Sequence, residues 1–370
     1  WELNSAGKNG YPFYMEKEMA EQPRVIARML EEKTTEGLPD FSGEQVPDSL
    51  LTSCESVCII ACGSAMHAGL AGQFLMKKFL HIPVSVEMAS EFMYTDPVVD
   101  EKTLVIAVSQ SGETIDTLEA LKYAKQKGAG SLAVINVKGS SIARESDAVL
   151  YTNAGPEIAV ASTKAYTSQL ALFALLVARM AYVRGDFTET ETRDFVRELK
   201  RVPDAMEKVL AGKEKIHHIA GRIISAKDIF MIGRGLDYFI AMEGSLKLKE
   251  VSYIHSEAYA SGELKHGPLA LITEHTPVVA VATQKQLLSK EVSNIREVRS
   301  RGADVVLFAK EQLMPEEEEG YLTFELPDVR DEFMCLPAAA ALQLLAYYVS
   351  SDKGYDVDKP RNLAKVVTVE

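Results

Sequence analysis

The chain has 370 residues, of which 47% are hydrophobic and 25% are charged, as is ordinary for a globular protein. At roughly 150 residues per domain, this length predicts two domains. The 53 acidic residues outnumber the 40 basic ones, which gives a net charge of −13. This charge argues against a nucleic-acid partner, because phosphate backbones are bound by clustered Lys and Arg.

No segment is predicted to span a membrane. The longest apolar stretches are Gln169–Val183, which contains Arg179, and Phe333–Val349, which contains Pro337. Both are shorter than the roughly 20 apolar residues that a membrane helix requires. No signal peptide is recognisable and the chain begins with Trp1, so we interpret it as part of a longer protein, with room for a further N-terminal domain. We expect a cytoplasmic location.

The cysteines predict neither a disulfide framework nor a metal site. Cys54, Cys58 and Cys62 recur every four residues. However, Cys58 lies in an apolar run predicted to be a buried strand, and a strand does not gather residues four apart around one ion. We interpret these cysteines as core thiols of a protein in a reducing compartment, and we expect no metal.

The most informative pattern is an internal repeat. Residues 57–63 form an apolar run that ends in Gly and precedes a helical pattern, and residues 229–235 repeat this plan. A second apolar run, 105–108, recurs as 278–281. Short apolar strands that alternate with amphipathic helices predict a parallel sheet with helices on both faces. We therefore expect an α/β protein with two such sheets in tandem.

The repeat divides the chain into four expected segments: an N-terminal helical segment (1–40), a first sheet domain (41–211), a second sheet domain (212–355) and a C-terminal tail (356–370). Within the first segment, residues 14–33 are predicted to be helical, with an interruption near Pro23 because proline has no backbone N–H.

A hydroxyl-rich loop is the strongest site candidate, because open parallel sheets bind ligands beyond the carboxyl ends of their strands. The first half carries Ser-Gln-Ser-Gly-Glu-Thr at 109–114, between a predicted strand and a predicted helix. Its hydroxyls, Gly112 and the helix N-terminus together suit a phosphomonoester. The structural alternative is a plain Ser N-cap. The equivalent loop of the second half, 282–287, lacks this pattern, so we expect the chemistry to be asymmetric.

The turn at Gly63 and Ser64 follows the first repeated strand and belongs to the same edge of the sheet. It either presents backbone N–H groups and the Ser64 hydroxyl to a polyol or is only a tight strand-to-helix turn. The residues alone leave both open.

A loop from Gly155 to Lys164 precedes an apolar helix, which Ser162 or Thr163 is predicted to cap. No structural need for the polarity of Glu157 is evident from the pattern. The loop is therefore a weak site candidate.

The second half carries a possible acid–base group. Lys247 and Glu250 are three residues apart and so share one helix face. A neighbouring ammonium can hold a carboxylate ionised as a general base, although a surface ion pair is the commoner use of this spacing. His266, in Gly-Glu-Leu-Lys-His-Gly-Pro, is placed in a loop and can transfer protons near neutral pH.

The tail contains Lys-Pro-Arg-Asn-Leu-Ala-Lys at 359–365. A terminal segment this specific suggests that the tail packs back onto the body of the protein. Lys365 would then be available as an amine nucleophile towards a carbonyl. The alternative is a frayed tail with a solvated lysine.

These motifs resemble tandem sugar-isomerase (SIS) domains. The chain as a whole resembles the isomerase portion of the glutamine–fructose-6-phosphate aminotransferase family, also called glucosamine-6-phosphate synthases. The motifs that carry the resemblance lie at 11–18, 62–63, 109–114, 161–167, 246–250, 262–268 and 360–365. The hydroxyl loop alone marks only a sugar-phosphate SIS domain, whereas the last two motifs are more specific.

The resemblance implies a chemistry. Four residues would hold the phosphate of fructose 6-phosphate: Ser109, Gln110, Ser111 and Thr114. His266, from a neighbouring subunit of a homodimer, would open the sugar ring, and Lys365 would form a Schiff base with the C2 ketone. Ammonia would displace the lysine, and Glu250, steadied by Lys247, would move a proton from C1 to C2 to give glucosamine 6-phosphate. No cofactor is implied.

Further residues would line the sugar, partly through main chain: Gly63, Ser64, Val160 and Ala364. Two residues of this sequence depart from the family pattern. Ala65 replaces a hydroxyl residue, and Ala159 replaces a Gly. In this family the ammonia comes from an N-terminal glutaminase domain, which nothing in this sequence resembles.

Two other functions are weighed against this one. The first is a sugar-phosphate isomerase or amino-sugar deglycase on the same paired domains, against which the Lys365 tail argues. The second is a sugar-phosphate sensor without catalysis, which would not require Lys247, Glu250, His266 and Lys365 together.

Overall fold

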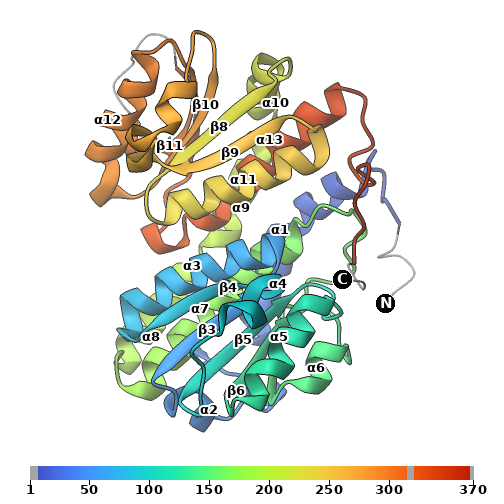
Figure 1. The fold of residues 1–370 in the computed structure, drawn as a ribbon, viewed down its shortest axis with the longest axis vertical. Helices are drawn as coiled ribbons and strands as arrows, with labels where there is room; N and C mark the ends of the chain where they lie inside the picture. Colours follow the sequence, from blue (N-terminus) through green and yellow to red (C-terminus); the bar gives the residue numbers. More distant parts are fainter. Residues whose placement is uncertain (1–6, 315–320, 367–370) are drawn as a thin grey trace.

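The computed structural model of the chain describes residues 7–314 and 321–366 (Figure 1). The first half forms α1 (Tyr14–Glu32), β1 (Thr34–Thr35), β2 (Leu38–Pro39), α2 (Asp48–Thr52), β3 (Ser56–Ala61), α3 (Gly63–Leu80), β4 (Val84–Met88), α4 (Ala89–Phe92), β5 (Thr103–Ser109), α5 (Ile115–Gln126), β6 (Gly130–Ile135), α6 (Ser141–Glu145), β7 (Ala148–Tyr151) and α7 (Lys164–Arg184). The connection consists of α8 (Glu189–Leu199), α9 (Val202–Ala211) and α10 (Lys213–Ile223). The second half forms β8 (Asp228–Gly233), α11 (Leu236–Ser252), β9 (His255–Ala260), the 3-10 turns η4 (Ser261–His266) and η5 (Pro268–Leu271), β10 (Pro277–Ala282), α12 (Leu288–Arg299), β11 (Asp304–Lys310), β12 (Leu322–Leu326) and α13 (Cys335–Asp352).

The predicted α/β class and its two parallel sheets are confirmed. The strands lie in the orders β4-β3-β5-β6-β7 and β12-β11-β10-β8-β9, and every neighbouring pair within these two sheets is parallel. Both sheets have the same topology, in which the first strand of the sheet (β3 or β8) lies between its second and third strands. The strand order therefore reverses between β3 and β5 and between β8 and β10, which are the positions where such sheets bind ligands.

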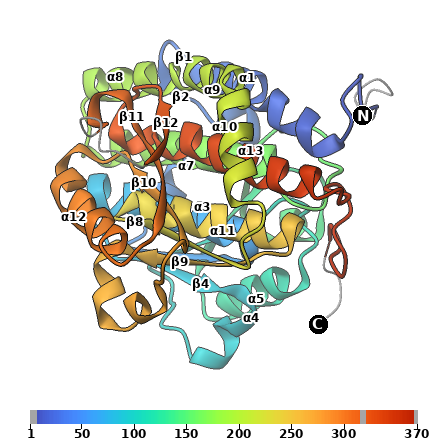
Figure 2. The same ribbon diagram turned by 90° about the horizontal axis from the view of Figure 1, so that it is seen from above.

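One hydrophobic core joins the two halves. Helices α3 and α7 cover the inner face of the first sheet, and α11 and α13 cover that of the second (Figure 1). In the perpendicular view α11 lies over α3 and α13 over α7 (Figure 2). The outer faces carry smaller cores beneath α4 and α5 in the first half and beneath α12 in the second.

Two helices are long and apolar enough to span a membrane by length and composition alone. They are Lys164–Arg184 and Asp331–Asp352, and their most apolar windows are 83% and 100% buried inside the protein. The helices are longer than the apolar stretches that the sequence analysis measured. Their burial identifies them as core helices between the two sheets, which explains why they are apolar on all sides.

The predicted interruption of the first helix is wrong, because α1 continues through Pro23. Proline leaves the carbonyl four residues earlier, that of Met19, without its helical donor. The buried side-chain amide of Gln22 donates to this carbonyl at 3.1 Å. Gln22 in turn accepts a hydrogen bond from the Thr167 hydroxyl at 2.8 Å, so α7 helps to hold the substitute donor in place.

The tail packs onto the body of the protein as predicted, as far as residue 366. Val357 is fully buried. The carboxylate of Asp358 accepts the N–H groups of Tyr14 and Met15 at 2.9 and 2.8 Å, which satisfies the first turn of α1. The Arg361 guanidinium lies 4.2 Å from the centre of the Tyr253 ring at the end of α11. The tail thus contacts the N-terminal helix and the second half together.

Candidate active site

The hydroxyl loop 109–114 lies at the carboxyl end of β5, beside the point where the strand order reverses. Ser109 ends the strand, and its hydroxyl accepts the Gly112 N–H at 3.0 Å and lies 3.0 Å from the Thr114 hydroxyl. The Ser111 hydroxyl accepts the Glu113 N–H at 3.1 Å. Thr114 is the N-cap of α5 without a side-chain hydrogen bond to it, so the plain capping alternative does not describe this loop.

Gly112 is required by the shape of the loop. Its φ is +69°, and a Cβ at this position would lie 2.0 Å from the Ser140 hydroxyl. Its carbonyl accepts the N–H of Ile142 at 3.0 Å, which ties the loop to the start of α6. The Gln110 carbonyl accepts the N–H of Asn136 at 3.1 Å, which ties it to the end of β6. These contacts fix the conformation of the loop.

The turn at Gly63 adjoins this loop, because β3 and β5 are neighbours. Gly63 has φ +55° and begins α3. The Ser64 hydroxyl, predicted to face a polyol, donates to the Glu243 carboxylate of α11 at 2.8 Å. His67 Nδ1 lies 2.8 Å from the other oxygen of Glu243. Glu243 is thus held by two side chains of α3 and joins the two halves at the site.

Lys247 and Glu250 form a buried pair rather than a surface one. Lys247 Nζ lies 2.5 Å from Glu250 and 3.5 Å from Glu243, and the Lys247 side chain is 1% exposed. Burial would lower the pKa of Lys247, but the charges of Glu250 and Glu243 raise it above its usual range. Burial would likewise raise the pKa of Glu243, and the charge of Lys247 lowers it. The lysine stays charged beside the predicted base.

Lys365 reaches the body of the protein through Glu157. Its Nζ lies 2.5 Å from Glu157 Oε2, and the Glu157 side chain is fully buried. The other oxygen, Oε1, accepts the N–H groups of Thr163 and Ala165 at 2.9 and 3.0 Å. The predicted capping of α7 by a Ser or Thr side chain is therefore wrong. Thr163 occupies the N-cap position, but Glu157 supplies the accepting oxygen, which explains the polarity of this loop.

The remaining predicted residues divide into two groups. Val160 lies against the tail, since its N–H donates to the Asp358 carbonyl at 3.0 Å, and Ala364 precedes Lys365 on the same tail. His266 is exposed at the end of the 3-10 turn η4 rather than in an irregular loop, and no hydrogen bond or ion pair joins its side chain to the other described residues. The structure of one chain does not bring His266 to Lys247, Glu250 or Lys365.

Sequence reasoning missed Glu243 as a site residue. One signal for it was present, because Glu243 lies four residues before Lys247 on the same helix face. Among residues 7–314 and 321–366, no group of three or more His, Cys, Asp or Glu side chains could hold a metal ion.

The two parallel sheets share one strand order, which indicates one type of domain present in two copies. The chain belongs to the SIS domain family, whose model matches residues 50–179 and 222–350.

Within this family, the chain is similar over its whole length to the glutamine–fructose-6-phosphate aminotransferases [isomerizing] of Caldanaerobacter subterraneus subsp. tengcongensis and Clostridium acetobutylicum, with 49% identity to each. It spans 61% of the length of these relatives. It is also similar to the structure of the C-terminal domain of glucosamine-fructose-6-phosphate aminotransferase from Francisella tularensis, with a TM-score of 0.92 and 39% identity over 96% of this chain and 100% of that one. The tagatose-6-phosphate ketose/aldose isomerase of Escherichia coli, with a TM-score of 0.75 and 18% identity over 99% of this chain and 98% of that one, shares the fold.

Proposed function

We propose that this chain is the sugar-handling half of a glutamine–fructose-6-phosphate aminotransferase. It would convert fructose 6-phosphate and ammonia to glucosamine 6-phosphate. The observation that carries the proposal is the return of the tail to the body of the protein, which seats Lys365 on Glu157. A sugar-phosphate isomerase or sensor has no need of this amine.

The proposed steps use the residues in turn. The phosphate is held by the loop 109–114, through Ser109, Gln110, Ser111 and Thr114, and by the N-terminus of α5. Gly63, Ser64, Val160 and Ala364 line the sugar. Three hydroxyls and free backbone N–H groups suit a phosphate without a lysine.

The covalent step belongs to Lys365. His266 opens the sugar ring, the Lys365 amine attacks the C2 ketone and water leaves as the Schiff base forms. Ammonia then displaces the lysine. Glu250, kept ionised by Lys247, moves a proton from C1 to C2 to give the aldose product.

The proposal extends to the assembly. Because His266 is exposed and has no partner among the other described residues, we assign it to the site of a neighbouring subunit in a homodimer. The ammonia would come from a glutaminase domain outside this chain, and the assembly would be cytoplasmic. We also keep the division into segments 1–40, 41–211, 212–355 and 356–370 as a proposal; residues 1–6 and 367–370 lie outside those that the structure describes.

The test is to incubate the chain with fructose 6-phosphate alone, with ammonium or with glutamine, and to identify the products by mass spectrometry. We expect glucosamine 6-phosphate with ammonium, or glucose 6-phosphate from isomerisation alone, and no use of glutamine. Lys365→Ala should bind the sugar phosphate without forming the amino sugar. Binding without any product in the unmodified chain would favour a sensor, and equal amino-sugar formation by Lys365→Ala would refute the Schiff-base role.

A further inference from the structure

Glu157 makes four polar contacts, and they divide its two oxygens between two tasks. Oε1 accepts the N–H groups of Thr163 and Ala165, which is a purely structural role at the start of α7. Oε2 accepts from Lys365 Nζ at 2.5 Å and from the Ser162 hydroxyl at 3.1 Å. The oxygen that faces Lys365 therefore carries no backbone hydrogen bond and is free to exchange a proton with the amine.

The carboxylate cannot move away from the amine. It is fully buried, and the helix N-terminus that it caps fixes its orientation. The Lys365 side chain, by contrast, is 20% exposed and lies on a tail, so the amine can turn towards a bound sugar. A fixed proton acceptor beside a movable amine suits a reaction in which that amine must first lose a proton.

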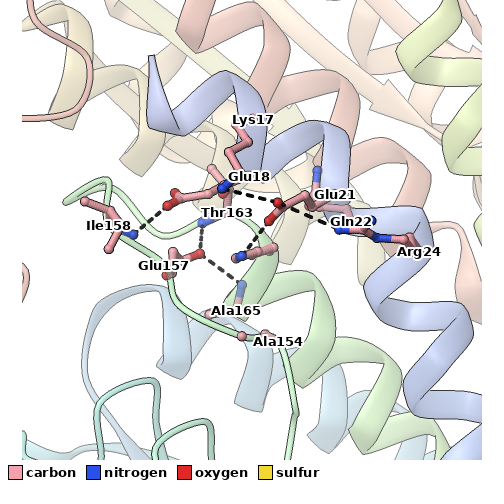
Figure 3. A network of polar contacts seen from close by, with 12 residues as sticks. Lys17, Glu18, Glu21, Gln22, Arg24, Ala154, Glu157, Ile158, Thr163 and Ala165 are labelled. Carbon is pink, nitrogen blue, oxygen red and sulfur yellow. Dashed lines mark hydrogen bonds and ion pairs between the residues drawn. The ribbon is translucent and has the colours of Figure 1, made fainter. Parts of the chain in front are cut away.

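A second carboxylate, that of Glu18 on α1, extends to the loop 155–164 at Ile158 (Figure 3). Its Oε1 accepts the N–H groups of Ile158 and Ala159 at 2.5 and 3.3 Å, whereas its buried Oε2 has no hydrogen-bond partner. Burial, and then the charge of Glu157, raise the pKa of Glu18 to about 8. Glu18 is thus mainly uncharged at neutral pH and leaves Glu157 as the anion that faces Lys365.

The other charged groups around Glu157 are already engaged. Lys164 Nζ lies 2.6 Å from Glu21. Lys17 Nζ lies 3.6 Å from the same carboxylate (Figure 3). Lys247 of α11, whose pKa Glu157 helps to raise, pairs with Glu250 at 2.5 Å. Burial would raise the pKa of Glu157 itself, but the charge of Lys365 and the N–H groups of α7 hold it below its usual range. Lys365 is therefore the proton partner of Glu157.

We propose that Glu157 is the proton acceptor and donor for Lys365 in Schiff-base formation, an inference that rests on the proposed function. Oε2 takes one proton from the Lys365 ammonium, and the freed lone pair forms the N–C bond to C2 of the open-chain sugar. The second amine proton passes to the former ketone oxygen. Glu157 then returns its proton to that hydroxyl, the C–O bond breaks and water leaves. The product is a protonated imine that keeps the third proton, and Glu157 is again a carboxylate.

The test measures how fast the Schiff base forms as a function of pH. The chain is mixed with saturating fructose 6-phosphate, quenched with borohydride after increasing times, and the reduced adduct on Lys365 is quantified by mass spectrometry. In the unmodified chain we expect a rate that is nearly flat from pH 6 to pH 7, below the pKa of about 8 of Glu18, because the proton moves within the protein. A rate that rises about tenfold per pH unit in the unmodified chain would overturn the proposal without any variant, since the ordinary lysine pKa is about 10.4.

Glu157→Gln keeps the carbonyl oxygen that caps α7 and removes only the proton acceptor. We expect its rate at pH 7 to fall about 100-fold and then to rise about tenfold per pH unit, because solvent must now deprotonate the amine. Glu157→Asp should restore part of the flat profile. A uniform loss at every pH in Glu157→Gln would show that the residue only positions the tail, and would refute the proposal.

The matched control is Glu21→Gln, which alters the same polar network without touching Lys365. We expect it to keep the flat profile. The two proposals fail in different ways. An unmodified chain that forms no adduct on Lys365 would refute the proposed function, whereas an adduct with the same pH profile in the unmodified chain and in Glu157→Gln would refute only the role of Glu157.

Discussion

The two halves of the molecule share one strand order but differ at the point where that order reverses. In the first half, the loop after β5 carries three hydroxyls, and its carbonyls accept the N–H groups of Ile142 and Asn136. In the second half, the loop after β10 is closed by a carboxylate from the same half. Asp237 of α11 accepts the Thr283 N–H at 2.7 Å and the Thr283 hydroxyl at 2.5 Å, and both residues are buried.

This difference shows that one fold can place a hydroxyl-rich loop at one reversal point and a loop bonded to an internal carboxylate at the other. When Gly63 and Gly235 are aligned, Asp237 corresponds to Ala65, one of the two departures noted above from the family pattern that the sequence resembles. A carboxylate two residues into the helix satisfies the donors that the loop would otherwise offer to a ligand. The first half has only a methyl group there, so no carboxylate at this position of α3 competes with the phosphate that we propose.

The largest expected effect comes from closing the first half in the same way. Ala65→Asp would place a carboxylate at the position of Asp237, where it would compete for the loop donors and repel the phosphate. We expect sugar-phosphate binding to become undetectable by calorimetry, a loss of at least about 100-fold. The control is Ala65→Asn, which has the same size without the charge and should lose only part of the affinity. Unchanged binding in Ala65→Asp would show that the halves are not equivalent at this position.

A smaller effect is expected on the stability of the protein, from the titration of Asp237. Burial raises its pKa from 3.8 to about 7, against the hydrogen bonds from Thr283. Between these pH values the folded state holds more protons on this group than the unfolded state, so stability falls as the pH rises towards 7. Relative to Asp237→Asn, the unmodified chain should lose about 2 kcal/mol between pH 5 and pH 7. Urea unfolding at several pH values measures this difference, and parallel pH profiles for the two chains would contradict it.

Much of the fold could be predicted from the sequence, because its signals are local. An apolar run followed by Gly marks the end of a strand, and the repeat of 57–63 at 229–235 identifies the two sheets. The hydroxyl loop was found for the same reason, since its residues are adjacent in the chain. The spacing of Lys247 and Glu250 is also a local signal. The burial of this pair is not local, because it depends on the fold.

The contacts that the sequence did not reveal join residues far apart in the chain. Ser64 and Glu243 are 179 residues apart, and Glu157 and Lys365 are 208 apart. No periodicity relates such residues. The continuity of α1 through Pro23 depends on the Gln22 side chain in the same way, because only the fold places Thr167 beside it. Local pattern finds the strands and loops, but tertiary packing decides which polar side chains meet.

The smallest expected effect tests whether the closed loop is itself an anion site. Asp237→Ala leaves the Thr283 N–H buried without its acceptor, which costs about 1–3 kcal/mol of stability. Formate has the size and charge of the missing carboxylate. At ten times its dissociation constant it would restore about 1.4 kcal/mol, seen as a rise in Tm. The unmodified chain and Asp237→Asn should show no such rise, because their loop donors are occupied. If formate stabilises all three chains equally, its effect is a general salt effect, and the second loop is then closed by packing rather than by an internal anion.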